Sequence, residues 1–77
     1  MEQKELTYGQ KAVGLTFNPS GNVEVESLKT AYAEIIDHMN DLRNLTKSPE
    51  IKRLASVAIT EAQTAQMWAV RAVTYKD

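Results

Sequence analysis

Apolar residues recur with helical spacing over two long stretches of the chain. In the first stretch, from about Val23 to about Leu45, they advance in alternating steps of three and four residues, and Ala31 and Ile36 widen the stripe. An α-helix makes one turn in 3.6 residues, so this spacing places the stripe on one side of a helix. Asn22 is suited to cap its first turn. The stripe consists of Val25, Leu28, Tyr32, Ile35, Met39 and Leu42.

The second stretch, from about Pro49 to about Tyr75, carries a stripe of small residues instead. Ser48 is a good N-cap, and proline is favoured at the first position of a helix. The stretch is rich in alanine and contains no glycine, which favours one uninterrupted helix. Six alanines recur in steps of three and four residues: Ala55, Ala58, Ala62, Ala65, Ala69 and Ala72.

The short segment between these stretches predicts that the two helices are antiparallel neighbours. Residues 1–21 contain all three glycines and one proline, and we expect them to form an extended arm that enters a turn. The predicted fold is therefore all-α: an arm over residues 1–21, then an antiparallel two-helix hairpin over residues 22–77. Its helices span about 23–45 and 49–75.

A two-helix hairpin of this composition leaves apolar side chains uncovered. The large stripe of the first helix can pack against the alanines of the second. Leu54, Val57 and Trp68 flank that seam, while Ile59, Met67, Val70 and Val73 point elsewhere. Since the arm is too short to cover them, we predict a homo-oligomeric helical bundle.

Composition excludes several classes of protein. The chain has 77 residues, 43% of them hydrophobic and 25% charged, with a net charge of −1 and no cysteine. One small globular domain is expected, without a disulfide or thiolate metal site. The near-zero charge argues against binding to a nucleic-acid duplex. The first residues lack the apolar core of a signal peptide, and no run of about 18 apolar residues occurs, so we expect a cytoplasmic location and no membrane span.

The sequence contains no arrangement of residues typical of an enzyme. His38 is the single histidine, and no serine or carboxylate is arranged around it by a motif. Glu34, Asp37 and Asp41 share a helix face, which is more typical of a solvated surface than of a metal site. The glycines form neither of the common phosphate-binding patterns. We therefore expect no catalytic residue, metal or cofactor.

Two residues are suited to binding a small flat anion. Phe17, the single phenylalanine, precedes the turn "NPSGN", where its ring can staple the arm to the helices or stack on a base. Lys29 lies in the first turns of the first helix, where it can be solvated or can contact a phosphate. Polar residues of "TEAQTAQMWAV" can bond one another in an interface or line a pocket.

The segments "AVGLTFNPSGN", "LKTAYAEIID" and "EAQTAQMWAVRA" resemble a family of small helical-hairpin proteins of phages. This is the anti-CBASS cyclic-nucleotide sponge family, whose hairpin is shared with the Thoeris anti-defence sponge. The resemblance covers about residues 10–77. The closing segment and the Phe-Asn-Pro turn before a helix with an early lysine are its most characteristic parts.

The resemblance implies a non-catalytic protein that assembles as a hexamer in the cytoplasm of an infected bacterium. Pockets between chains would capture cyclic dinucleotides such as cyclic GMP-AMP, and in some members also cyclic trinucleotides. By position, Phe17 would stack on a base and Lys29 would contact the phosphates. Their neighbours Asn18 and Thr30 belong to the same candidate site, and Arg53 and Arg71 are secondary candidates for phosphate contact. The family's aromatic residue is often tyrosine, and its spacing to the lysine is usually a few residues longer than here.

The sequence leaves two other functions open. A small helical module that binds another protein through its exposed stripe would have no nucleotide ligand. A nucleic-acid-binding four-helix dimer would show salt-dependent binding to DNA or RNA.

Overall fold

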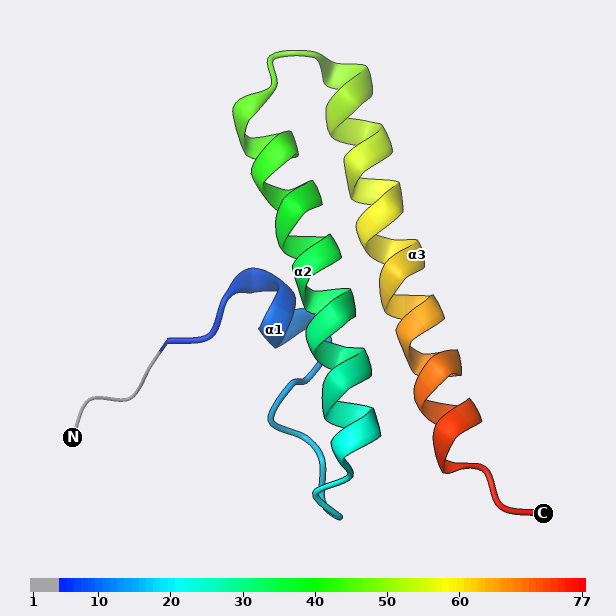
Figure 1. The fold of residues 1–77 in the computed structure, drawn as a ribbon. Coiled ribbons are helices and arrows are strands. Elements are labelled where there is room, and N and C mark those ends of the chain that lie inside the picture. The colour runs from blue at the N-terminus through cyan, green and yellow to red at the C-terminus, as the bar shows by residue number, and fades with distance from the viewer. Residues whose placement is uncertain (1–4) are drawn as a thin grey trace.

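The computed structural model describes residues 5–77 and contains three helices there. They are α1 (Tyr8–Ala12), α2 (Val23–Leu45) and α3 (Pro49–Thr74), and no strand is present in these residues. α2 and α3 form an antiparallel hairpin, and α1 packs against α2 (Figure 1). The molecule is flat, its Cα atoms spanning 45 × 40 × 12 Å. The predicted all-helical hairpin is confirmed.

Local signals in the sequence set the ends of the two long helices. The Asn22 side chain accepts hydrogen bonds from the amides of Glu24 and Val25 at the start of α2. The Ser48 hydroxyl accepts one from the amide of Ile51, and Pro49 occupies the first turn of α3. The observed α2 spans the same residues as its predicted range, and α3 ends one residue earlier than expected.

The arm is not extended as predicted. Its first four residues lie outside the described part of the chain, and Tyr8–Ala12 form helix α1. Thr7 and Gln10 build a capping box at its start, each side chain bonding the other's backbone amide. At its end, the amides of Gly14 and Leu15 donate to the carbonyls of Lys11 and Gln10. This is a Schellman motif, and Gly14 supplies the positive φ of 64° that the motif needs.

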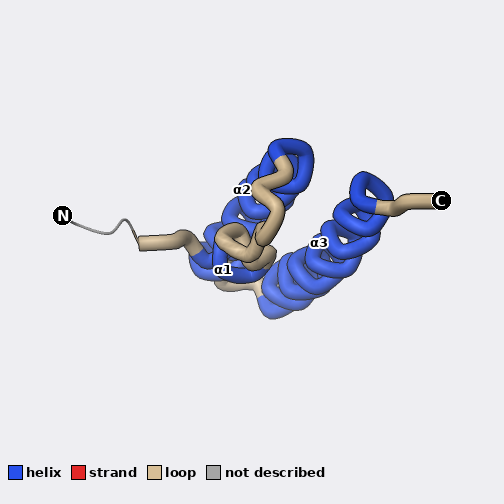
Figure 2. Tube along the Cα trace, turned by 90° about the horizontal axis from the view of Figure 1, so that it is seen from below, coloured by secondary structure: helices blue, strands red, loops and turns tan. Residues whose placement is uncertain are grey.

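α1 is held on α2 by close backbone contact. The amide of Gly9 donates a 2.6 Å hydrogen bond to the Asp37 carboxylate. A Cβ atom at Gly9 would overlap the carbonyl oxygen of Ala33, so glycine is needed for this approach. The Arg43 guanidinium lies 5.3 Å from the centroid of the Tyr8 ring, a cation–π contact. These contacts fix α1 and the turn that follows it against one flank of α2 (Figure 2).

The hairpin seam is rotated relative to the predicted stripes. On α2 the buried residues are Val25, Lys29, Ala33 and Ile36, whereas Ile35 is 51% exposed. Because α1 packs on a second side of α2, the buried side chains of α2 face both α1 and α3. The core cluster joins Val13, Ala33, Ile36 and Ile59.

The alanines of α3 line one edge of the seam rather than its centre. Ala55 is buried, but Ala65 and Ala72 are exposed. Ile59, which the sequence analysis placed outside the seam, is buried in it together with Gln66. The predicted exposure of the flanks is observed at Leu54, Val57, Met67 and Trp68, which are 46–67% exposed.

Candidate functional site

Lys29 is a buried cation whose partners are backbone carbonyls of the arm. It is 5% exposed. Its Nζ atom donates hydrogen bonds to the carbonyl oxygens of Gly14, at 3.0 Å, and Phe17, at 2.6 Å. Bonds from a charged donor are about twice as strong as neutral ones. Lys29 therefore ties the turn after α1 to the second turn of α2.

A chain of backbone and amide contacts shapes the rest of this turn. The Phe17 amide donates to the Gly14 carbonyl, and the Gly21 amide to the Asn18 carbonyl. The Asn18 side chain bonds the backbone of Asn22 twice, donating to its carbonyl at 2.8 Å and accepting from its amide at 3.1 Å. Asn22 in turn caps α2. The side chain of Asn18 thus braces the loop into the helix.

Phe17 projects from this braced turn and is 72% exposed. The Lys29 Nζ atom lies 5.6 Å from the ring centroid, within cation–π range. The structure therefore brings together Phe17, Lys29 and Asn18. An exposed aromatic face beside a buried ammonium can accept a stacked base whose phosphate lies near the cation.

The other candidate residues lie at different places. Thr30 follows Lys29 directly and is exposed. Arg71 is exposed near the end of α3, which antiparallel packing brings to the end of the hairpin where α2 begins. Arg53 is on the first turns of α3, about 20 Å from Gln66 along the helix at 1.5 Å per residue. Ile36 and Ile59 share the core cluster, and Lys29 and Gln66 each lie seven residues from them toward the same end of the antiparallel hairpin. Gln66 is therefore at about the level of Lys29, and a single chain does not bring Arg53 to Lys29.

Arg53 already has a partner. Its guanidinium forms a two-pronged ion pair with Glu50, one turn earlier, at 2.7 and 3.0 Å. The hydrogen bonds from Arg53 lower the pKa of the exposed Glu50 carboxyl below its ordinary value. This pair supports the first turn of α3, and an incoming phosphate would have to compete with Glu50 for the guanidinium.

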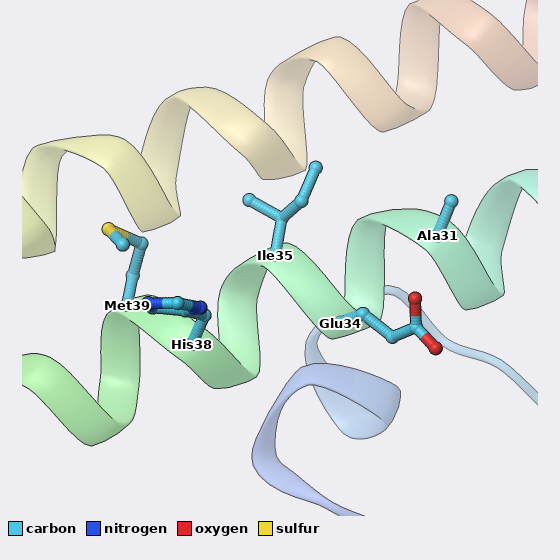
Figure 3. A pocket seen from close by; sticks show the side chains of 5 residues that line it. All are labelled: Ala31, Glu34, Ile35, His38 and Met39. Atoms are coloured by element: carbon cyan, nitrogen blue, oxygen red, sulfur yellow. The ribbon is translucent and has the colours of Figure 1, made fainter.

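A hollow of about 390 Å³ lies elsewhere, along α2. Figure 3 shows Ile35 and Met39 pointing toward α3, with α1 on a different side of α2. Neither Phe17 nor Lys29 lines this hollow, so in a single chain the hollow is separate from the candidate ligand-binding residues. Its lining consists of Ala31, Glu34, Ile35, His38 and Met39.

Sequence reasoning missed the residues that hold the arm in place. The Thr7-x-x-Gln10 capping box was a readable signal for α1. The pairing of Gly9 with Asp37 and the stacking of Arg43 on Tyr8 join distant residues, and no local pattern indicates them. Asp37 thus has a structural partner rather than belonging to a solvated carboxylate face.

Over residues 5–77, no group of three or more His, Asp or Glu side chains is placed to hold a metal ion. Within the same range, no helix is both long and apolar enough to cross a membrane.

Comparison with known proteins identifies the hairpin. The family model described as "Acb2/Tad1, hairpin domain" matches residues 10–74, which include α2, α3 and the turn bearing Phe17. Neither a curated protein nor a solved structure matches the chain significantly. The match spans most of the sequence and agrees with the resemblance seen in its motifs. The chain therefore belongs to the Acb2/Tad1 hairpin-domain family, the anti-CBASS and anti-Thoeris sponges.

Proposed function

We propose that this protein binds and sequesters cyclic dinucleotide signals, such as cyclic GMP-AMP, without cleaving them. The Acb2/Tad1 family is known for sequestering cyclic nucleotides. The proposal places this capture in the cytoplasm of a phage-infected bacterium, where it would keep an antiviral effector from being activated. The proposal includes cyclic trinucleotides as a second class of ligand.

The observation that carries the proposal is the pairing of Phe17 with Lys29. A cyclic dinucleotide has two flat bases and two phosphates, so it needs both stacking surfaces and cations. The Phe17 ring is exposed and stands on a braced backbone. The Lys29 ammonium has three N–H donors, and the arm carbonyls take two of them. The third is the donor that we assign to a phosphate.

Enclosure would come from a second chain. The protein is flat and Phe17 lies on its surface, so a single chain can cover only one side of a ligand stacked on Phe17. We propose that neighbouring copies close the pocket, as a homo-oligomer and by family analogy a hexamer. In such an assembly Thr30, Arg53 and Arg71 of other chains become available to the ligand, although they are apart in one chain.

Calorimetry against a panel of cyclic di- and trinucleotides tests this function. Phe17→Ala should weaken capture by about 5- to 150-fold, since stacking contributes about 1–3 kcal/mol per base. Lys29→Ala should weaken it as well, and both variants should keep the oligomeric state. Thr60→Ala, an exposed change on α3, is the matched control. Intact ligand should be recovered after denaturing the protein.

The alternative function is a protein-interaction module with no nucleotide ligand. The observation in its favour is the exposed outer surface of α3, where Trp68 is 67% exposed, together with the C-cap residue Tyr75, which is 63% exposed. An oligomer whose melting temperature does not change with any cyclic nucleotide would favour this alternative and refute sequestration.

A further inference from the structure

Phe17 is held by hydrogen bonds at both of its peptide groups. Its amide donates to the Gly14 carbonyl at 2.9 Å, and its carbonyl accepts from the Lys29 ammonium at 2.6 Å. The backbone that carries the ring is therefore fixed by the turn on one side and by α2 on the other. The ring is left with its two side-chain torsions, and the residue is mostly exposed.

The segment after Phe17 closes a small loop onto the start of α2, and Asn18 makes all three of its hydrogen bonds. Its Nδ2 atom donates to the Asn22 carbonyl at 2.8 Å, and its Oδ1 atom accepts from the Asn22 amide at 3.1 Å. Its own carbonyl accepts from the Gly21 amide at 3.0 Å. Residues 18–22 are thus closed at the N-cap of α2.

The two side-chain bonds of Asn18 support the position of the neighbouring ring. Residues 19–21 are exposed, so they contribute little packing of their own. The Lys29 ammonium holds the Phe17 carbonyl, and the Asn18 side chain holds the next residue against α2. Because both polar atoms of the Asn18 side chain already bond backbone groups, this residue is better suited to support the ring than to meet a ligand.

We propose that Asn18 is a positioning residue of the candidate site, which holds the stacking ring of Phe17 in place without contacting the ligand. This inference rests on the proposed function and deepens it, since it names the residue that preorganises the aromatic surface. A ring on a fixed backbone loses little freedom when a base stacks on it, so less of the interaction is offset on binding. Apparent affinity also scales with the fraction of chains that already have the binding geometry.

Fluorine NMR of the ligand-free protein tests the positioning role. Phe17 is the single phenylalanine, so para-fluorophenylalanine labels this ring alone. In Asn18→Ala the ring should move more freely, so its fluorine line should narrow. Asn22→Ala is the matched control, because it removes the side-chain cap of α2 but keeps the backbone groups that Asn18 bonds. Its line should stay as broad as the parent's. An unchanged line in Asn18→Ala, or equal narrowing in both variants, would overturn the proposal.

A second variant keeps the test decisive if Asn18→Ala does not fold. In Asn18→Asp the carboxylate has nearly the shape of the amide and still accepts from the Asn22 amide, but it cannot donate to the Asn22 carbonyl. The fluorine line should narrow here too, and less than in a folded Asn18→Ala protein. A line as broad as the parent's would overturn the proposal.

Calorimetry with cyclic GMP-AMP shows whether Asn18 acts through the ring. Asn18→Ala should weaken capture by about 2- to 10-fold, the change in population when about one net hydrogen bond is lost. In a Phe17→Ala background the same change should have little further effect, because no ring is left to position. Losses that simply add would indicate direct contact with the ligand and overturn the proposal. A parent that binds no cyclic nucleotide, with a line that narrows in Asn18→Ala alone, would refute sequestration and support the positioning of Phe17.

Discussion

Replacing Gly9 with alanine sets two physical effects against each other. Gly9 lies inside α1, where alanine is favoured over glycine by about 1 kcal/mol. Helix propensity alone therefore predicts a more stable protein. In the structure, however, a Cβ atom at this position overlaps the Ala33 carbonyl and comes within 2.9 Å of the Asp37 carboxylate oxygen. Because the obstacle is backbone, α1 has to move away from α2.

The contacts that Gly9→Ala would weaken determine how much the free energy of unfolding should fall. The hydrogen bond from the Gly9 amide to the Asp37 carboxylate contributes about 1.5–3 kcal/mol. Val13, 5% exposed beneath the end of α1, contributes about 1.5–3 kcal/mol through burial. Their sum is an upper bound, because an undocked segment regains backbone entropy. We expect Gly9→Ala to lower the free energy of unfolding by about 2 kcal/mol after the propensity gain.

Urea denaturation followed by circular dichroism, at one fixed protein concentration, measures this change. Hydrogen exchange at the amides of residues 9–13 should accelerate in the same variant. Gly21→Ala is the control, since Gly21 has a φ of 61° but an added Cβ would meet no atom within 4 Å. Its cost should be the left-handed strain alone, about 1–2 kcal/mol. A Gly9→Ala protein as stable as the parent, or more stable, would refute the close-approach argument.

Three further changes follow from the described contacts. Ile36→Val should lower the free energy of unfolding by about 0.5–1.5 kcal/mol in the same urea assay, because Ile36 is fully buried. Ser48→Ala should cost about 1 kcal/mol through the lost cap of α3, and Ser48→Asp should restore it. The lowered pKa of Glu50 means that its pairing with Arg53 stabilises the fold above the ordinary glutamate pKa and is lost as pH falls through the folded value. Glu50→Gln should accordingly flatten the stability profile between about pH 5 and 3, and an unchanged profile would show that the exposed pair contributes nothing.

The hairpin could be predicted from the sequence because its signals are local. Asn22 and the Ser48-Pro49 pair define helix starts without reference to the rest of the chain, and the three-and-four spacing defines the helices between them. The rotation of the seam could not be predicted in the same way. It depends on α1 docking at Ala33, and that contact requires a glycine twenty-four positions earlier in the chain.

Only part of the candidate site is brought together in one chain: Phe17 and Asn18 lie beside Lys29, whereas Arg53 lies far along α3. The resemblance singled out Phe17 and Lys29, and the structure places them within cation–π distance. Helical periodicity predicted that Lys29 is a surface residue, because only apolar side chains were used to define the buried side of the helix. Its burial depends on the carbonyls of Gly14 and Phe17, whose direction is set by a turn that residue patterns describe only coarsely.

The central position of α2 has a consequence for how this chain tolerates change. α1 and α3 each pack on α2. The Gln63 amide donates to the Ala12 carbonyl at 3.4 Å, and Val13, just after α1, shares the core cluster with Ile59 of α3. Energetic effects add when sites share no partner. Substitutions at the start of the arm should therefore add to substitutions in the last turns of α3, whereas substitutions in α2 affect the packing of both α1 and α3.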